Sequence, residues 1–149
     1  MTLASPLTPP APDVIGIIAG GGQFPFLLAR HLHEQGHRVV AVAFVGHTQP
    51  DLREHVDACR VLRLGQLGKL IAFLGRERVG RVCFAGSIDK PKALSFRPDF
   101  RAARLLFRTG LKGDDALLRA VIAELEREGL KVVQAADLGE HGAGARTGL

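Results

Sequence analysis

Short apolar runs that end at glycine alternate in this chain with segments of helical periodicity, and this alternation constrains the fold more than any other feature. The first run, residues 14–20, reads VIGIIAG, which is typical of a strand buried on both faces of a parallel sheet. Strand-like runs occupy residues 14–20, 39–45, 61–64, 82–86 and 131–135, and helical patterns occupy 25–36, 66–78, 99–108 and 114–128. The order predicts βαβ units in an α/β fold: a Rossmann-like, open, mostly parallel sheet of about five strands with flanking helices.

The two ends of the chain differ in composition from the part between them. Residues 1–13 are rich in Pro, Ala and Thr and predict a disordered leader, because they hold too little apolar surface to offset the entropy of ordering. Residues 138–149 are rich in glycine and show no apolar period, which predicts a disordered tail. A single α/β domain over residues 14–137 is therefore expected.

Charge and composition limit the classes of partner that this chain is expected to bind. Lys and Arg outnumber Asp and Glu by 20 to 15, giving a formal net charge of +5, which favours phosphate groups, nucleic acid or an acidic membrane surface. The chain has no Trp or Tyr, and its eight Phe lie in apolar runs, so it lacks the exposed aromatic side chains on which single-stranded nucleic acid stacks. We therefore expect no nucleic acid partner.

The sequence also bears on where the protein acts. The start shows no signal peptide, and no later stretch approaches 18 uninterrupted apolar residues, so a cytoplasmic protein is expected. Cys59 and Cys83 show neither C-x-x-C spacing nor a nearby His at a zinc-site interval. They are interpreted as buried thiols in a reducing compartment.

The strongest local signal is a glycine turn, Gly20-Gly21-Gly22-Gln23, between the first strand and the first helix. Free backbone N–H groups and the helix dipole favour an anion at such a turn, so these residues are predicted to bind phosphate. A tight turn that binds nothing is the alternative. No NAD is expected, because Pro25 replaces the third glycine of a dinucleotide fingerprint and no acid closes the second strand.

Polar residues follow the third and fourth strands at the same edge of the predicted sheet, where open α/β folds bind ligands. Gln66 and Lys69 open the helix after the third strand, although Lys69 is equally explained as a solvated charge. Asp89, Lys90 and Arg97 follow the fourth strand, and Lys90 and Arg97 are the preferred phosphate partners. Arg101 and Arg104 are three apart on a helix and are expected to solvate its outer face.

Two adjacent carboxylates, Asp114 and Asp115, begin the last long helix. They are suited to capping its free N–H groups, and they are also candidates for a Mg²⁺ site beside a pyrophosphate. The six His show no zinc-protease spacing, and no G-x-S-x-G nucleophile motif is present.

Four blocks, taken in order and spacing, carry a family resemblance: IIAGGGQFP at 17–25, RLGQLGKLI at 63–71, AGSIDKP at 85–91 and GDDALLRAV at 113–121. Together they resemble the LpxI family of UDP-2,3-diacylglucosamine pyrophosphatases. The resemblance implies hydrolysis of UDP-2,3-diacylglucosamine to UMP and 2,3-diacylglucosamine 1-phosphate (lipid X) in lipid A biosynthesis, assisted by Mg²⁺ or another divalent metal. It further implies a peripheral contact with the inner membrane surface.

The resemblance also implies a second, C-terminal domain carrying the acidic catalytic centre, with the ligand held between the two domains. This chain is expected to represent the N-terminal, ligand-binding half alone, to lack the catalytic residues, and to be truncated and inactive as a hydrolase by itself. A sheet face left uncovered by a missing domain would favour self-association. A noncatalytic nucleotide- or phosphate-binding module is the alternative, and a nicotinamide oxidoreductase is a third and weaker one.

Overall fold

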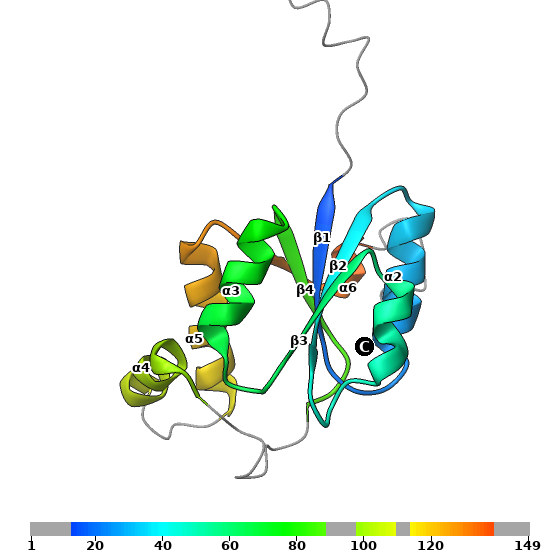
Figure 1. Ribbon diagram of the computed structural model, residues 1–149. Coiled ribbons are helices and arrows are strands. Elements are labelled where there is room, and N and C mark those ends of the chain that lie inside the picture. Colours follow the sequence, from blue (N-terminus) through cyan, green and yellow to red (C-terminus); the bar gives the residue numbers. More distant parts are fainter. Residues whose placement is uncertain (1–12, 89–97, 110–113, 139–149) are drawn as a thin grey trace, which may run out of the picture.

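The structure, a computed structural model, describes residues 13–88, 98–109 and 114–138. Its five strands form one parallel sheet in the order β3-β2-β1-β4-β5 (Figure 1). The strands are β1 (Val14–Ala19), β2 (Arg38–Phe44), β3 (Ala58–Leu62), β4 (Arg81–Ala85) and β5 (Lys131–Val133). The predicted Rossmann-like open sheet is confirmed, and every described strand pair is parallel.

Helices pack on both faces of the sheet (Figure 1). One face carries α2 (Phe24–Glu34), the 3-10 helix η1 (Pro50–His55) and α6 (Ala135–Leu138). The other carries α3 (Leu67–Arg76), α4 (Phe100–Thr109) and α5 (Asp114–Arg127). Since helices cover both faces, the apolar surface expected from an uncovered sheet face is not found among the described residues.

The central strands read as continuous apolar runs because both of their faces are buried. Along β1, Ile15 and Ile17 pack into the core beneath α2, while Ile18 packs into the core beneath α3. Ile17 lies in register with Ala41 of β2 and Cys83 of β4, all 0% exposed. Side chains alternate between the two faces of a strand, so a strand with two covered faces needs apolar residues at every position.

The position predicted for the third strand is wrong. It was predicted at 61–64 but spans Ala58–Leu62, pairing with β2 from Val40↔Ala58 onward. As an edge strand it is only partly buried, with Val61 50% exposed, and its apolar pattern is correspondingly weak. Between β2 and β3 lies η1, whose Leu52 is fully buried.

The last strand is shorter than predicted. The prediction of a strand at 131–135 is wrong beyond Val133, because Ala135 already begins α6. At this turn the Gln134 N–H donates to Asp137 Oδ2 at 3.4 Å. Leu138, one residue past the predicted boundary, is only 5% exposed and packs in the core beneath α2. The predicted leader, except for Asp13, and residues 139–149 of the predicted tail lie outside the described residues.

Candidate ligand-binding edge of the sheet

The loops that follow β1 and β4 touch through their main chains. Gly21 N–H donates to the Ser87 carbonyl at 2.7 Å, Ser87 N–H donates to the Gly21 carbonyl at 3.3 Å, and Gly20 N–H donates to the Ala85 carbonyl at 2.7 Å. A Cβ on Gly20 would lie 2.4 Å from the Ser87 oxygen, and one on Gly86 would lie 2.6 Å from the Gly21 oxygen. Glycine is therefore required at this contact for a steric reason, independently of any ligand.

This contact divides the predicted phosphate-binding turn into two parts. The N–H groups of Gly20 and Gly21 donate hydrogen bonds to carbonyls of the protein itself. Within the described residues, the N–H groups of Gly22 and Gln23 have no acceptor, and they lie at the start of α2, where the helix dipole is positive. The donors that remain available to an anion are thus those of Gly22 and Gln23.

Thr48 connects the loop after β2 to the end of β1, a role that no sequence pattern predicted. Its hydroxyl donates to the Ala19 carbonyl at 2.7 Å and accepts the Phe44 N–H at 2.8 Å, and the residue is 8% exposed. The nearby Gln23 Nε2 donates to Gln49 Oε1 at 3.3 Å. A polar loop containing one threonine is too common a pattern to predict such a role.

The start of α3 already holds a carboxylate. Gly68 N–H donates to Asp99 Oδ2 at 2.6 Å, while Asp99 Oδ1 accepts the Ala102 N–H at 2.9 Å, so Asp99 caps both α3 and α4. Gln66 Oε1 accepts the Arg63 N–H at 2.8 Å and so stabilises the turn before α3. Lys69 is exposed one residue after Gly68, where its ammonium is free to reach a ligand.

Several predicted site residues fall outside the described residues. Asp89, Lys90 and Arg97 are among them, and although α5 begins at Asp114, the side chains of Asp114 and Asp115 are not described either. Among the residues that the structure describes, no group of three or more His, Cys, Asp and Glu side chains could hold a metal ion. The phosphate-binding and metal-binding roles of these five residues therefore stay predictions.

Arg101 does not solvate the outer face of its helix, so that prediction is wrong. Its Nε donates to Glu124 Oε2 on α5 at 2.7 Å, and its Nη2 donates to Glu128, which directly follows α5. Glu124 is 3% exposed and also accepts Arg127 Nη2 at 2.8 Å. The hydrogen bond from Arg101, with the charges of nearby arginines, lowers the pKa of Glu124 despite its burial. Arg104, by contrast, is exposed.

A half-open groove of about 520 Å³ runs between α2 and η1. It is lined by Phe26, Arg30, His33, Glu34, Glu54, His55, Val56 and Asp57. His33 Nε2 lies 2.8 Å from Asp57 Oδ2, the same oxygen that accepts the Val39 N–H at 2.8 Å. Burial raises the pKa of Asp57, but these hydrogen bonds and the charges of His33 and Arg38 outweigh it and lower the pKa overall. The sequence did not indicate this groove.

The two cysteines differ in burial. Cys83 is fully buried, and burial, with a contribution from Asp137, raises the pKa of its thiol to about 11. Cys59 is only half-buried, so the prediction of two buried thiols is wrong for Cys59. It lies on the edge strand, where one side of the ladder is unpaired.

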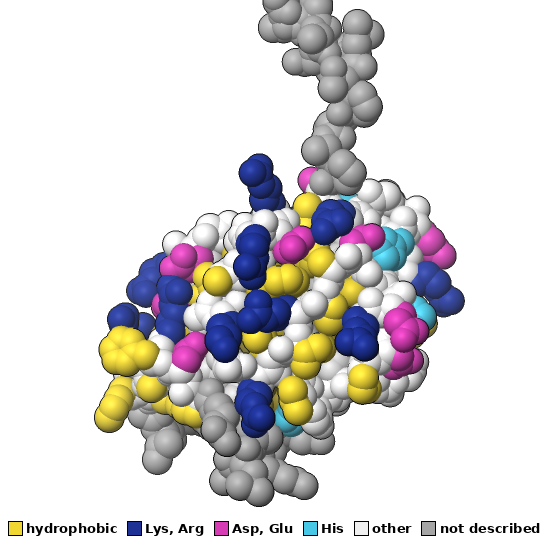
Figure 2. Space-filling view, in the orientation of Figure 1, with side chains coloured by type: hydrophobic (Ala, Val, Ile, Leu, Met, Phe, Trp, Pro, Cys, Tyr) yellow, Lys and Arg dark blue, Asp and Glu magenta, His cyan; other side chains and the backbone are white. Residues whose placement is uncertain are grey.

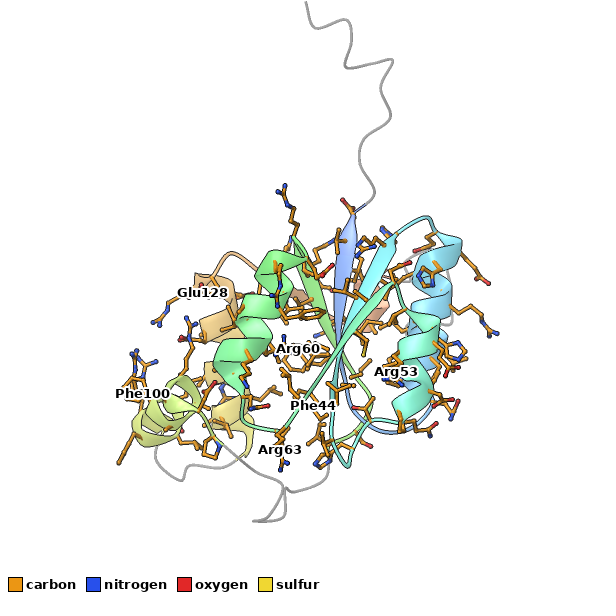
Figure 3. The ribbon with its side chains drawn as sticks, in the orientation of Figure 1. Phe44, Arg53, Arg60, Arg63, Phe100 and Glu128 are labelled. Carbon is orange, nitrogen blue, oxygen red and sulfur yellow. The ribbon has the colours of Figure 1, made fainter. Side chains whose placement is uncertain are left out.

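Basic side chains extend along this edge strand. Figure 3 shows Arg53, Arg60 and Arg63 on β3 and the segments that flank it, and Figure 2 shows Lys and Arg side chains spread over the same face. Arg63 follows the last residue of β3, so it lies at the carboxyl edge. No sequence pattern predicted these arginines as a group, because they come together only when the edge strand forms.

The parallel strand order, the flanking helices and the glycine loops at the carboxyl edge define a Rossmann-like α/β domain. Residues 14–141 match the family described as the LpxI N-terminal domain, and the chain belongs to this family. UDP-2,3-diacylglucosamine pyrophosphatase LpxI of Caulobacter vibrioides is 35% identical over 121 residues, which cover 79% of this chain and 42% of that protein. The chain thus spans less than half the length of this relative.

Two solved structures resemble the fold at low sequence identity. One is glycinamide-RNase-transformylase T from Mycobacterium tuberculosis, with a TM-score of 0.48 and 15% identity over 83% of this chain and 29% of that chain. The other is the Bordetella bronchiseptica enzyme WbmH in complex with NAD+, with a TM-score of 0.48 and 17% identity over 83% of this chain and 55% of that chain. In the described part of the chain, no helix is long and apolar enough to cross a membrane.

Proposed function

We propose that this chain forms the substrate-binding α/β domain of a UDP-2,3-diacylglucosamine pyrophosphatase. The observation that carries the proposal is the match of residues 14–141 to the LpxI N-terminal domain. In the proposed reaction, water adds its oxygen to one phosphorus of the diphosphate, and the bridging oxygen leaves with the other. The products are UMP and lipid X.

The chain's own residues would act by binding the diphosphate. Gly22 and Gln23 offer N–H donors at the positive end of α2, an arrangement that stabilises phosphate oxygens. Arg63 and Lys69 add cationic side chains at the same edge of the sheet, where they would balance the diphosphate charge. Gln66 supports this edge indirectly, because its side-chain oxygen holds the Arg63 backbone.

The proposed reaction includes Mg²⁺, although its candidate ligands lie outside the described side chains. A divalent ion would neutralise phosphate charge and activate water, and Asp114 and Asp115 remain its candidate ligands. Their side chains lie outside the described residues, so their contact with a metal ion stays a prediction. The substrate is a diacylated lipid, so we further propose that the domain works at the cytoplasmic surface of the inner membrane.

Ligand titration tests the binding role. We expect UMP and lipid X to bind the full chain, and Lys69→Ala to weaken this binding about tenfold, the size expected from one charged phosphate contact. Lys131→Ala is the matched control: it removes the same charge from an exposed residue at the opposite, amino edge of the sheet. No association of the unaltered chain at millimolar ligand, or equal weakening by both variants, would refute the proposal.

A hydrolysis assay on the same samples tests whether the domain alone has activity. UDP-2,3-diacylglucosamine with Mg²⁺ is followed by the appearance of UMP. Turnover that Lys69→Ala reduces would support a role in the pyrophosphatase reaction. Binding without turnover is expected of a substrate-binding domain alone, so the alternative indicated by the sequence, a noncatalytic nucleotide- or phosphate-binding module, is favoured instead if the chain binds UMP and lipid X no more tightly than inorganic phosphate.

A further inference from the structure

Helix α4 presents the most exposed large apolar side chains among the described residues. Phe107 is 89% exposed and Phe100 is 78% exposed, so the expectation that the chain lacks exposed aromatic side chains is wrong. The Arg104 guanidinium carbon lies 6.0 Å from the centre of the Phe100 ring, and Arg108 is exposed one residue beyond Phe107. Figure 3 shows Phe100 on the outer side of α4, and Figure 2 shows hydrophobic and basic side chains side by side over this helix. The outer face is thus both aromatic and cationic.

Helical spacing makes these four residues a single face. Positions 100, 104, 107 and 108 follow the i, i+4, i+7, i+8 pattern that brings side chains to one side of a helix. Neighbouring positions anchor the helix to the domain, since Leu105 is 3% exposed and Arg101 is paired with Glu124 and Glu128. The segment contains no Asp or Glu between Phe100 and Thr109. The aromatic and cationic face is therefore held outward by a helix that Leu105 and Arg101 fix to the domain.

The chemistry of this face identifies its partner. A surface that takes up aromatic rings and neutralises arginines must offer an apolar layer next to fixed negative charge, which an anionic bilayer provides at its headgroup boundary. A symmetric contact between two copies would bring Arg104 and Arg108 close to the same arginines of the other copy, which like-charge repulsion disfavours. The net charge of +5 acts in the same direction as these arginines.

We propose that the outer face of α4 docks on an anionic phospholipid bilayer, with Phe100 and Phe107 entering the acyl boundary and Arg104 and Arg108 contacting lipid phosphates. The proposal rests on the proposed function in that a diacylated substrate is presented by a membrane. Asp99 connects the two sites directly, because it caps α4 and the ligand-edge helix α3 together. Docking through α4 would therefore place the ligand-binding edge close to the bilayer.

Vesicle flotation of the full chain tests the surface. We expect binding to phosphatidylcholine vesicles with about one third phosphatidylglycerol, little binding to pure phosphatidylcholine, and weakening by salt. Phe100→Ser with Phe107→Ser should reduce binding at least about tenfold. The matched control is Leu27→Ser with Val61→Ser, which removes two side chains that are 52% and 50% exposed elsewhere on the domain. This control should bind like the unaltered chain.

Two double variants, each removing two arginine charges, test the role of Arg104 and Arg108 in the same assay. Arg104→Gln with Arg108→Gln should lose most binding to phosphatidylglycerol, whereas Arg30→Gln with Arg76→Gln, two exposed arginines on α2 and α3, should lose much less. Thermal melts establish that each variant is folded. Absence of vesicle binding by the unaltered chain, or equal losses in test and control pairs, would overturn the proposal.

Two further readouts keep the alternatives apart. If light scattering shows a dimer that Phe100→Ser with Phe107→Ser dissociates, and vesicles do not bind, the face is a contact between copies and the bilayer proposal is wrong. UMP titration without vesicles reports on the proposed function alone. Vesicle binding through α4 with no UMP binding would therefore retain the docking surface while refuting the ligand site.

Discussion

The loops after β1 and β4 hold one another through main-chain atoms, whereas the segments around α3, α4 and α5 are held together by carboxylates. In the first region, which we call the glycine region, Gly21 and Ser87 exchange backbone hydrogen bonds. In the second, the carboxylate region, Asp99 caps two helices and Glu124 receives two arginines. The first region thus has no space for a side chain at Gly20 or Gly86, while the second depends on the ionised Glu124 and therefore on pH.

The largest effect is expected in the glycine region, from Gly86→Ala. Gly86 has φ +96°, and a Cβ there would lie 2.6 Å from the Gly21 oxygen, so the substitution combines left-handed strain with a backbone clash. We expect a loss of about 3 kcal/mol or more in the free energy of unfolding, measured by denaturant titration. Weaker UMP binding should accompany it, because the loop that precedes Gly22 must shift.

Gly22→Ala separates strain from contact. Gly22 also has a positive φ, +86°, but a Cβ there would meet nothing within 4 Å. Only the strain of an alanine in the left-handed backbone conformation remains, and we expect the free energy of unfolding to fall by about 1 kcal/mol. Equal losses in Gly86→Ala and Gly22→Ala would show that the contact between the β1 and β4 loops is not tight, and the comparison between the regions would fail.

The sequence predicted the fold well because the central strands are buried on both faces. Such strands must be apolar wherever they are buried, as β1 is along its length and β2 is after Arg38. The edge strand β3 was misplaced because partial burial leaves no such pattern, and α6 was missed because its four residues are too few to show a helical period. Local patterns thus predict elements in proportion to how completely those elements are buried.

The site was less predictable, because it depends on contacts between segments distant in sequence. The glycine turn was recognisable from the sequence. That the N–H groups of Gly20 and Gly21 donate to carbonyls at the end of β4 and in the loop after it follows only from the strand order. Likewise, Asp99 looked like a helix start, while its second bond, to Gly68, spans 31 residues. Arg101 was assigned to solvent because the buried partner Glu124 lies on another helix. Spacing along one segment carries no information about such partners.

An intermediate effect is expected in the carboxylate region from Asp99→Ala. The substitution removes the acceptor of the Gly68 N–H at 2.6 Å and of the Ala102 N–H at 2.9 Å. Losing two caps should cost about 2 kcal/mol in the free energy of unfolding. Asp99→Asn retains one acceptor oxygen and should cost about half as much. If both variants unfold like the unaltered chain, Asp99 does not hold α3 and α4 together, and vesicle binding through α4 should then be unaffected as well.

The smallest effect, and the one that best separates the regions, is the pH dependence of Glu124→Gln. Because Glu124 has a lower pKa in the folded protein than its ordinary value of 4.5, its ionised form contributes stability that is present above that value and lost as the pH falls through the folded pKa. Near neutral pH, Glu124→Gln should therefore be less stable by about 1 kcal/mol, since an amide cannot accept charge-assisted bonds from both Arg101 and Arg127.

This deficit should vanish in acid, because protonated Glu124 and the neutral amide are then nearly equivalent. Denaturant titrations between about pH 3 and pH 7 measure the difference at each pH, with Glu126→Gln, an exposed neighbour on α5, as the control. Gly86→Ala, whose defect is steric, should keep its deficit at every pH. If the Glu124→Gln deficit persists unchanged in acid, the ionised pair with Arg101 is not what holds α4 against α5. The contrast between a steric and an electrostatic region would then have to be given up.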